Sequence, residues 1–386
     1  MTAPPPPRIH IVGLGNLGCL VAHALRSIHP RRPVTLFTHK TSVARMFDSH
    51  YGGLITVERN RLAVSRKGFD VEISSMAIEN LLPYAKPLSP QKEDEKIDHL
   101  IVTTRAPHAK KALQPLIRRL TPQSTIAFVQ NGLEVVEEIN SLYFPDPETR
   151  PNYLLGVWPH GIFSPKEPLF EPFRVVIGSS ARLKLGVMLP TIEGLPDLTK
   201  TPAHAALPPT AAYLLSSLLS AEDLAGMYVA PQEVIASQLE RFALNAVIYP
   251  LTVMFDCQNG ALLHNSHAAQ VVKVLLHEIS KVFCKLPELE KLHNKELRFS
   301  EETLYNTFVK VVRYNGEKES PMLQEVKKGI PTEVEYLNGW IVRKGEELGV
   351  ECKGNYMMFH VVKAKEKMAA RERERELPIE GLETNF

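Results

Sequence analysis

The sequence predicts an α/β protein in which an amino-terminal Rossmann-type, doubly wound sheet is followed by an all-α carboxyl-terminal domain. Short β-branched segments alternate with helical patterns from residue 8 to about residue 180, as in a parallel sheet covered by helices. From Thr210 to about Lys367 the apolar residues follow a helical period almost throughout. Between these regions, residues 183–210 contain five prolines and few periodic apolar positions, which indicates a linker or an insertion.

The expected elements of the first region follow one another along the chain. Residues 9–12 (IHIV) form a short run rich in β-branched side chains, which suits a strand buried on both faces. A helix is expected at 17–27 and another at 110–120, where apolar residues recur at helical spacing. The remaining β-rich runs, each bounded by turn residues, lie at 34–38, 54–57, 62–65, 69–73, 99–104 and 125–132.

These patterns divide the chain into four segments. They are a Rossmann domain at 1–182, the proline-rich linker or insertion at 183–210, a helical substrate domain at 211–367 and a charged tail at 368–386. Residues 363–376 (KAKEKMAARERERE) alternate charges of both signs, so we expect a solvated helix end there. A surface for a protein partner is the alternative.

Bulk composition limits the class of protein. The chain has 386 residues and a formal net charge of +2, which gives no argument for binding nucleic acid or an anionic membrane. No run of about 18 apolar residues occurs, and the start MTAPPPPRIHIVG lacks the apolar stretch of a secretory signal. The four cysteines never form a CxxC pair. We therefore expect a cytoplasmic protein without a metal site.

A glycine-rich turn follows the first strand. Gly13, Gly15 and Gly18 make a G-x-G-x-x-G pattern between a strand and a helix, the context in which this motif binds a dinucleotide. The first glycine permits the tight turn, the second lets a diphosphate approach the backbone, and the third lets the helix pack closely on the strand. The expected phosphate loop comprises Gly13, Leu14, Gly15, Asn16, Leu17 and Gly18.

The end of the second strand indicates NADP rather than NAD. NAD sites usually place an Asp or Glu about 20 residues after the motif, where it binds the ribose. This strand instead ends in FTHK, so His39 and Lys40 stand where an acid would repel a 2′-phosphate. These two residues are predicted to bind the cofactor.

Four further stretches carry a family resemblance. They are TTRAPHA (103–109), VQNG (129–132), ALNAVIYPLT (243–252) and MLQEVKKGIPTEVEYLNG (322–339). Together with GLGNLG they make the chain resemble the ketopantoate reductase family over nearly its whole length. The resemblance implies a Rossmann domain joined to a helical domain, and NADPH-dependent reduction of 2-dehydropantoate to pantoate in pantothenate biosynthesis.

The resemblance also implies the positions of site residues. Asn131 is expected to contact the cofactor at the carboxyl end of a strand, Arg105 replaces a lysine near the cofactor, and Glu333 matches a cofactor-linked acid. Pro321 stands where the family commonly has a substrate-contacting serine, and its neighbour Ser320 can take that place. The expected substrate-binding residues are Asn245, Tyr249, Asn259 and Ser320, with Tyr249 replacing an asparagine.

The catalytic pair implied by the resemblance is Arg241 and Asn245. Arg241, Asn245 and Tyr249 are spaced four apart, so on a helix they form one ridge. The family's catalytic lysine falls at Arg241. A guanidinium stabilises the negative charge that hydride transfer leaves on a carbonyl oxygen, but it is a poor proton donor.

These observations favour an oxidoreductase with NADP as its cofactor and a small 2-oxo acid as its substrate. Two alternatives remain open at this point. One is a catalytically impaired family member that serves as a dinucleotide-binding scaffold or regulatory protein, because Arg241, Tyr249 and Pro321 depart from the family pattern. The other is a reductase of a different 2-oxo acid. A homodimer is possible; nucleic-acid and membrane partners are not expected.

Overall fold

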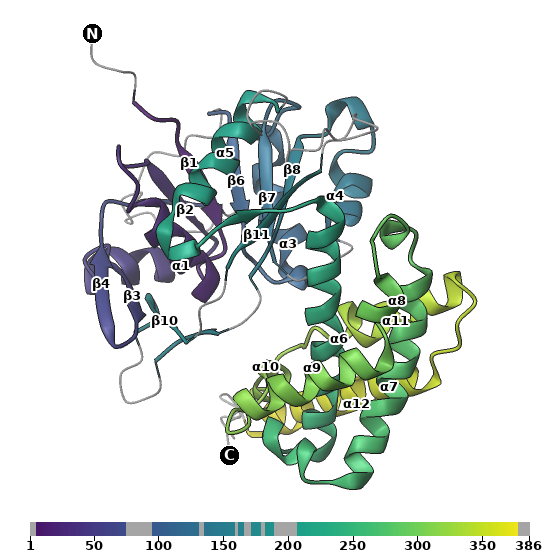
Figure 1. Ribbon diagram of the computed structural model, residues 1–386. Helices are drawn as coiled ribbons and strands as arrows, with labels where there is room; N and C mark the ends of the chain where they lie inside the picture. Colours follow the sequence, from purple (N-terminus) through teal and green to yellow (C-terminus); the bar gives the residue numbers. More distant parts are fainter. Residues whose placement is uncertain are drawn as a thin grey trace, which may run out of the picture. The chain divides into compact units, whose positions relative to one another are not determined.

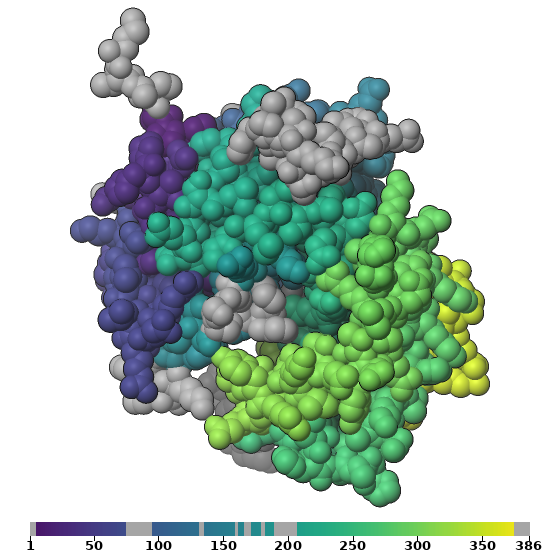
Figure 2. Space-filling model, in the orientation of Figure 1, coloured from purple at the N-terminus to yellow at the C-terminus, as the bar shows by residue number. Residues whose placement is uncertain are grey.

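The chain folds into two compact units, Met1–Gln238 and Leu239–Phe386. The computed structural model describes residues 5–74, 95–130, 135–158, 161–165, 171–178, 182–188 and 207–376. The predicted fold class is confirmed, since unit 1 is an α/β domain built on a largely parallel sheet and unit 2 is helical (Figure 1). In the space-filling view, unit 1 runs from purple to teal and unit 2 from green to yellow (Figure 2).

An eight-stranded sheet forms the centre of unit 1, with the strand order β12-β11-β8-β7-β6-β1-β2-β5. All strands from β8 to β5 in this order are parallel. The order reverses between β1 and β6, and in such sheets a ligand binds at the carboxyl ends of the strands beside that reversal. The parallel strands are β1 (Ile9–Val12), β2 (Val34–Thr38), β5 (Asp70–Ile73), β6 (His99–Val102), β7 (Thr125–Val129) and β8 (Asn152–Val157).

Two of the predicted strands belong to a separate four-stranded sheet, so their expected place in the parallel sheet was wrong. β3 (Ile55–Arg59) and β4 (Leu62–Arg66) pair antiparallel across a tight turn at Asn60 and Arg61, which both have positive φ. A two-residue hairpin makes its two strands antiparallel neighbours, whereas parallel neighbours require a longer crossover connection. The sheet is completed by β10 (Arg174–Ile177) and β9 (Ile162–Phe163) in the order β4-β3-β10-β9.

The expected linker at 183–210 also needs correction. β11 (Lys184–Met188) is an inner strand of the large sheet, where it pairs antiparallel with β8 and parallel with β12 (Met227–Tyr228). Leu185 and Val187 are fully buried. The prolines hid this strand, because three of the five follow it in residues 189–206, which lie outside the described part of the chain.

The helical unit begins later than the sequence indicated, at Leu239 rather than residue 211. α5 (Pro209–Ser220) belongs to unit 1, where Leu214, Leu215 and Leu218 join the core beneath the sheet. The Thr210 hydroxyl donates to the main-chain oxygen of Gln123 over 2.6 Å. The other helices of unit 1 are α1 (Asn16–Leu25), α2 (Thr41–Arg45), α3 (Ala106–Leu113) and α4 (Val135–Tyr143), with a π-helical turn at Met46–His50 and 3₁₀ turns at Gln114–Arg119, Pro147–Thr149 and Glu222–Leu224.

Unit 2 is packed around an aromatic cluster. The rings of Phe242, Phe283 and Trp340 meet at centroid distances of 5.0–6.4 Å, and Phe299 adds an edge contact to Phe283 at 5.3 Å. α6 (Pro231–Phe255) crosses the division between the units. The remaining helices are α7 (Ser266–Lys285), α8 (Lys295–Arg298), α9 (Glu301–Tyr314), α10 (Pro321–Lys327), α11 (Asn338–Glu347) and α12 (Lys353–Glu376), with 3₁₀ turns at Asn259–Leu263, Pro287–Leu289 and Val334–Tyr336.

α12 continues through the first part of the expected charged tail, and residues 377–386 lie outside the described chain. Among the described helices, none is long and apolar enough to cross a lipid bilayer.

A buried carboxylate holds the start of α12. Glu278 on α7 accepts hydrogen bonds from the main-chain amides of Gly354 and Asn355 at 2.8 and 2.9 Å, and from the Asn355 side chain at 2.7 Å. The Asn355 side-chain oxygen in turn accepts from Asn338 at 3.0 Å. Since the first amides of a helix have no partner within it, this carboxylate caps α12 from a neighbouring helix.

Replacing Glu278 with Ala should therefore lower the free energy of unfolding by about 2–4 kcal/mol, because two buried donors of Asn355 and the part-buried Gly354 amide lose their acceptor. The exposed Glu290, replaced by Ala, is the matched control and should change it by less than about 0.5 kcal/mol. Urea unfolding followed by circular dichroism measures both, and equal midpoints for the two variants would contradict the capping role.

Candidate cofactor and substrate sites

The glycine turn lies at the reversal point of the large sheet. Gly13 has φ of +105°, and a Cβ there would come within 2.7 Å of the Thr104 amide nitrogen. The Thr103 hydroxyl donates to the Gly13 carbonyl over 2.7 Å. At Gly18 a Cβ would lie 1.8 Å from that same carbonyl oxygen. Two of the three glycines are therefore required by the contact between the β1 and β6 turns.

Gly15 differs, because a Cβ at this position would meet no atom of the described chain within 4 Å. It is exposed and precedes α1, whose first turn has neither a side-chain cap nor an acidic residue. The start of a helix carries unsatisfied amides and partial positive charge, so it favours an anion. Asn16 is held by the Ser164 hydroxyl at 2.9 Å, while Leu14 and Leu17 pack against the core.

Basic side chains gather after β2 and around α3. Burial lowers the pKa of His39, and the charges of Lys40 and Lys111 lower it further. The pKa of His108 is lowered by burial and then by Arg105, His39 and Lys111. These electrostatic effects on the two pKa values indicate that His39, Lys40, Arg105, His108 and Lys111 lie near one another. His39, Lys40 and Arg105 are all exposed, and side chains of these types bind phosphate groups.

Sequence reasoning missed Gln130, which follows β7 at the same edge of the sheet. It is 6% exposed, and both polar atoms of its side chain lack a hydrogen-bond partner within the described part of the chain. Its main-chain oxygen accepts from Gln238 over 3.2 Å. The signal that could have found it is its place directly after a buried strand. The neighbouring Asn131, which the sequence favoured, lies outside the described residues.

In unit 2 the charge of Glu333 acts on Arg241, which lies 92 positions earlier in the sequence. Arg241 lies on α6, and Glu333 precedes the 3₁₀ turn at Val334–Tyr336. Burial lowers the pKa of Arg241, whereas the charges of Tyr249 and Glu333 oppose that shift. The ridge of Arg241, Asn245 and Tyr249 is therefore set in a partly desolvated place, with Asn245 7% exposed. Arginine stays charged there, since its ordinary pKa is far above neutrality.

Asn259 keeps one open acceptor. Its side-chain nitrogen donates to the Asn315 carbonyl over 3.1 Å, and its main-chain amide donates to the Lys318 carbonyl over 3.0 Å. The side-chain oxygen, in a residue 8% exposed, has no donor among the described residues. An unsatisfied buried acceptor favours a ligand that brings a hydroxyl or amide hydrogen.

The expected substrate contact of Ser320 is not supported. Ser320 is fully buried, and its oxygen accepts the Leu323 amide hydrogen over 3.1 Å as the N-cap of α10. The same hydroxyl shares a 2.6 Å hydrogen bond with Thr252 on α6. This side chain therefore caps α10 and joins it to α6, because its hydrogen-bonding capacity is engaged inside the unit. Pro321 occupies the first position of α10, where it suits a helix start.

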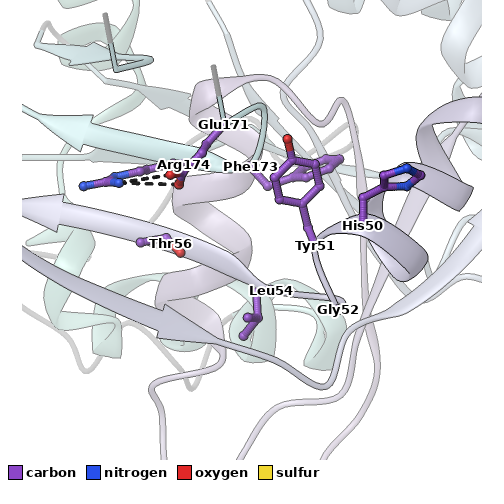
Figure 3. Close-up of a pocket in the computed structure, with 8 residues that line it drawn as sticks. All are labelled: His50, Tyr51, Gly52, Leu54, Thr56, Glu171, Phe173 and Arg174. Atoms are coloured by element: carbon purple, nitrogen blue, oxygen red, sulfur yellow. Dashed lines mark hydrogen bonds and ion pairs between the residues drawn. The ribbon is translucent and has the colours of Figure 1, made fainter. Parts of the chain in front are cut away.

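A pocket of about 430 Å³ lies elsewhere in unit 1 (Figure 3). Its charged lining residues, Glu171 and Arg174, are paired with each other at 3.3 Å. Tyr51 and Phe173 make an edge contact at 5.5 Å between ring centroids. No residue of the glycine turn or of the basic cluster lines this pocket. The lining residues are His50, Tyr51, Gly52, Leu54, Thr56, Glu171, Phe173 and Arg174.

The glycines of the turn provide a matched pair of substitutions. Gly18→Ala should lower the melting temperature by several degrees, because its Cβ would overlap the Gly13 carbonyl. Gly15→Ala adds the same atom in open space and should leave the melting temperature within about 1 °C of the unmodified protein. Differential scanning calorimetry compares the two. Equal losses would show that the close contact does not limit this turn.

Comparisons with known proteins identify the family of this chain. The family model "Ketopantoate reductase PanE/ApbA" matches residues 9–189, and the model for the carboxyl-terminal part of the same family matches residues 233–366. A probable 2-dehydropantoate 2-reductase from Schizosaccharomyces pombe is 26% identical over 363 residues, which cover 92% of this chain and 96% of the relative. A ketoisovalerate reductase from Beauveria bassiana is 25% identical, over 90% of this chain and 80% of its own.

A solved structure shares the fold. The crystal structure of a PanE/ApbA family ketopantoate reductase from Ralstonia eutropha has a TM-score of 0.65 and 16% identity, and the alignment covers 94% of this chain and 99% of that one. Both family models lie in the expected order, and together they span most of the described residues of both units. The chain therefore belongs to the ketopantoate reductase PanE/ApbA family.

Proposed function

We propose that this protein is an NADPH-dependent reductase of a 2-oxo acid, with 2-dehydropantoate, reduced to pantoate, as its preferred substrate. The observation that carries the proposal is the partly desolvated Arg241, on which the charge of Glu333 acts. Both parts of the chain match models of the ketopantoate reductase family. A place in pantothenate biosynthesis follows from this substrate. The cytoplasmic location and the homodimer expected from the sequence stay predictions.

The residues present at the strand ends fit a phosphorylated dinucleotide. The amides at the start of α1, reached across Gly15, would hold the diphosphate, and His39, Lys40 and Arg105 would hold a 2′-phosphate. The Glu72 carboxylate on β5 forms an ion pair with Arg119. Gln130 offers an amide whose donors and acceptor have no partner among the described residues. The bound cofactor would supply the hydride.

Arg241 would act on the substrate carbonyl. Hydride addition turns the carbonyl carbon tetrahedral and leaves negative charge on its oxygen, and a guanidinium stabilises that charge more strongly where water is excluded. Arg241 is a poor acid, so the proton on the product hydroxyl would come from water. Asn245 and Tyr249, on the same ridge, would orient the acid.

Asn259 supports the choice among 2-oxo acids. Its side-chain oxygen, which has no partner among the described residues, can only accept a hydrogen bond and so needs a ligand with a donor. The 4-hydroxyl of 2-dehydropantoate provides one, whereas ketoisovalerate has a hydrogen on C3 in place of the hydroxymethyl group and so lacks that hydroxyl. A site built to bind a hydroxyl discriminates strongly against an analogue that lacks it, because the buried polar group is then left unpaired. This argument favours 2-dehydropantoate.

Substitutions of Arg241 test the proposal. With NADPH and 2-dehydropantoate, Arg241→Met should lower kcat/KM roughly 10²- to 10³-fold, since it removes the charge that stabilises the developing oxyanion. Arg241→Lys keeps a positive charge and adds a proton donor, so turnover should be equal or higher. Stopped assays of NADPH absorbance measure both. Arg313→Lys, an exposed change on α9, is the control. The reductase proposal fails if neither the unmodified protein nor Arg241→Lys oxidises NADPH with any 2-oxo acid.

Cofactor preference is tested at Lys40. Lys40→Glu should weaken NADPH binding roughly 10- to 100-fold, because a carboxylate replaces a cation facing the 2′-phosphate. NADH binding should change less than about threefold, roughly half a power of ten. Isothermal titration gives both dissociation constants. Lys67→Glu, an exposed change directly after β4, controls for net charge. Equal effects of Lys40→Glu on the two cofactors would rule out the assigned phosphate site.

A further inference from the structure

The carboxyl-terminal half of α12 holds the loop that carries Glu333. This loop, residues 328–333, joins α10 to the following 3₁₀ turn, and α12 packs against α10. Both helices are labelled in Figure 1. Glu366 on α12 accepts the main-chain amide hydrogen of Thr332 over 2.7 Å. Its side chain is 13% exposed, although its segment has the sequence of a solvated helix end.

The loop is fixed on both sides of Glu333. Thr332, next to it, is 7% exposed, and its hydroxyl oxygen accepts the Val334 amide hydrogen over 3.2 Å. At the other end, the Arg373 guanidinium donates to the Lys328 carbonyl over 2.6 Å. Gly329 has φ of +62° and lies against the Arg373 side chain. The bond from Glu366 therefore reaches the residue directly before Glu333.

An acid on a helix surface ordinarily pairs with a lysine or arginine three or four positions away. Glu366 has such a neighbour in Lys363 at 3.5 Å, but its shorter contact goes to a main-chain amide 34 positions away in sequence. Such a contact fixes the path of a loop, because the main chain cannot move without breaking it. Glu372, further along α12, is exposed and serves as a comparison.

We propose that Glu366 is a positioning residue of the reductase, which sets the distance between Glu333 and Arg241 through its bond to the Thr332 amide. The inference rests on the proposed function. The charge of Glu333 acts on Arg241, and a Coulomb interaction in a partly desolvated place depends steeply on distance. Loss of the Glu366 acceptor releases the loop, moves Glu333 and weakens the electrostatic setting of the guanidinium.

Steady-state kinetics on the full-length protein test this. Glu366→Ala should lower kcat/KM for 2-dehydropantoate roughly 10- to 100-fold, the size expected for a misplacement of about 1 Å in a catalytic group. Glu366→Gln retains the side-chain oxygen that accepts the amide hydrogen, so it should keep most of the activity. Glu372→Ala should match the unmodified protein. An equal loss in Glu366→Ala and Glu372→Ala, or no loss in either, would overturn the proposal.

A double-mutant cycle separates positioning from general destabilisation. If Glu366 acts through Glu333, then Glu366→Ala should cost less than about twofold once Glu333→Gln has already removed the charge. A purely structural role would instead multiply the two losses, which contradicts the proposal.

Hydrogen exchange tests the bond apart from activity. Glu366→Ala should raise the exchange rate of the Thr332 amide at least about tenfold, while Glu372→Ala leaves it unchanged. Unchanged protection in Glu366→Ala overturns the positioning role even if the protein reduces 2-oxo acids. Raised exchange in a protein without any turnover leaves the bond established and rejects the proposed function instead.

Discussion

The chemistry proposed for this protein depends on a guanidinium held in a partly desolvated place on α6. Such a charge is costly unless an opposite charge lies close by, and Glu333 provides one across 92 positions of sequence. The resemblance implies a family lysine at this position, and arginine can serve there because stabilising an oxyanion requires charge and proton donation is a separable task.

In unit 1 the glycine turn leaves the backbone amides at the start of α1 unobstructed at the edge of the sheet. The contact between the Gly13 carbonyl and the Thr103 hydroxyl closes the turns after β1 and β6 onto each other. Gly18 lets α1 pack closely against the Gly13 carbonyl, and the space beside Gly15 contains no atom of the described chain. The nearby basic groups raise the local positive potential. The arrangement therefore suits a ligand with several phosphates.

Local patterns predicted the elements that depend on local physics. The run IHIV and the segment 34–38 became strands because their side chains favour burial on both faces. The ridge on α6 followed from helical spacing. Features set by distant contacts were missed. β11 needs β8 as a partner, Ser320 is occupied by Thr252 and Leu323, and Glu366 reaches a loop 34 positions away. The role of Arg241 came from the family resemblance, because a lone arginine on a helix is ordinarily an ion-pair partner.

The most direct test of the central claim is the pH dependence of kcat for the unmodified protein and for Arg241→Lys. Arg241 stays protonated, so kcat of the unmodified protein should show no alkaline decline assigned to this position. The lysine variant should gain one, because burial lowers the ordinary lysine pKa of about 10.4, and activity is lost as pH rises through the lowered value. Profiles of identical shape would show that this side chain does not face the reacting carbonyl.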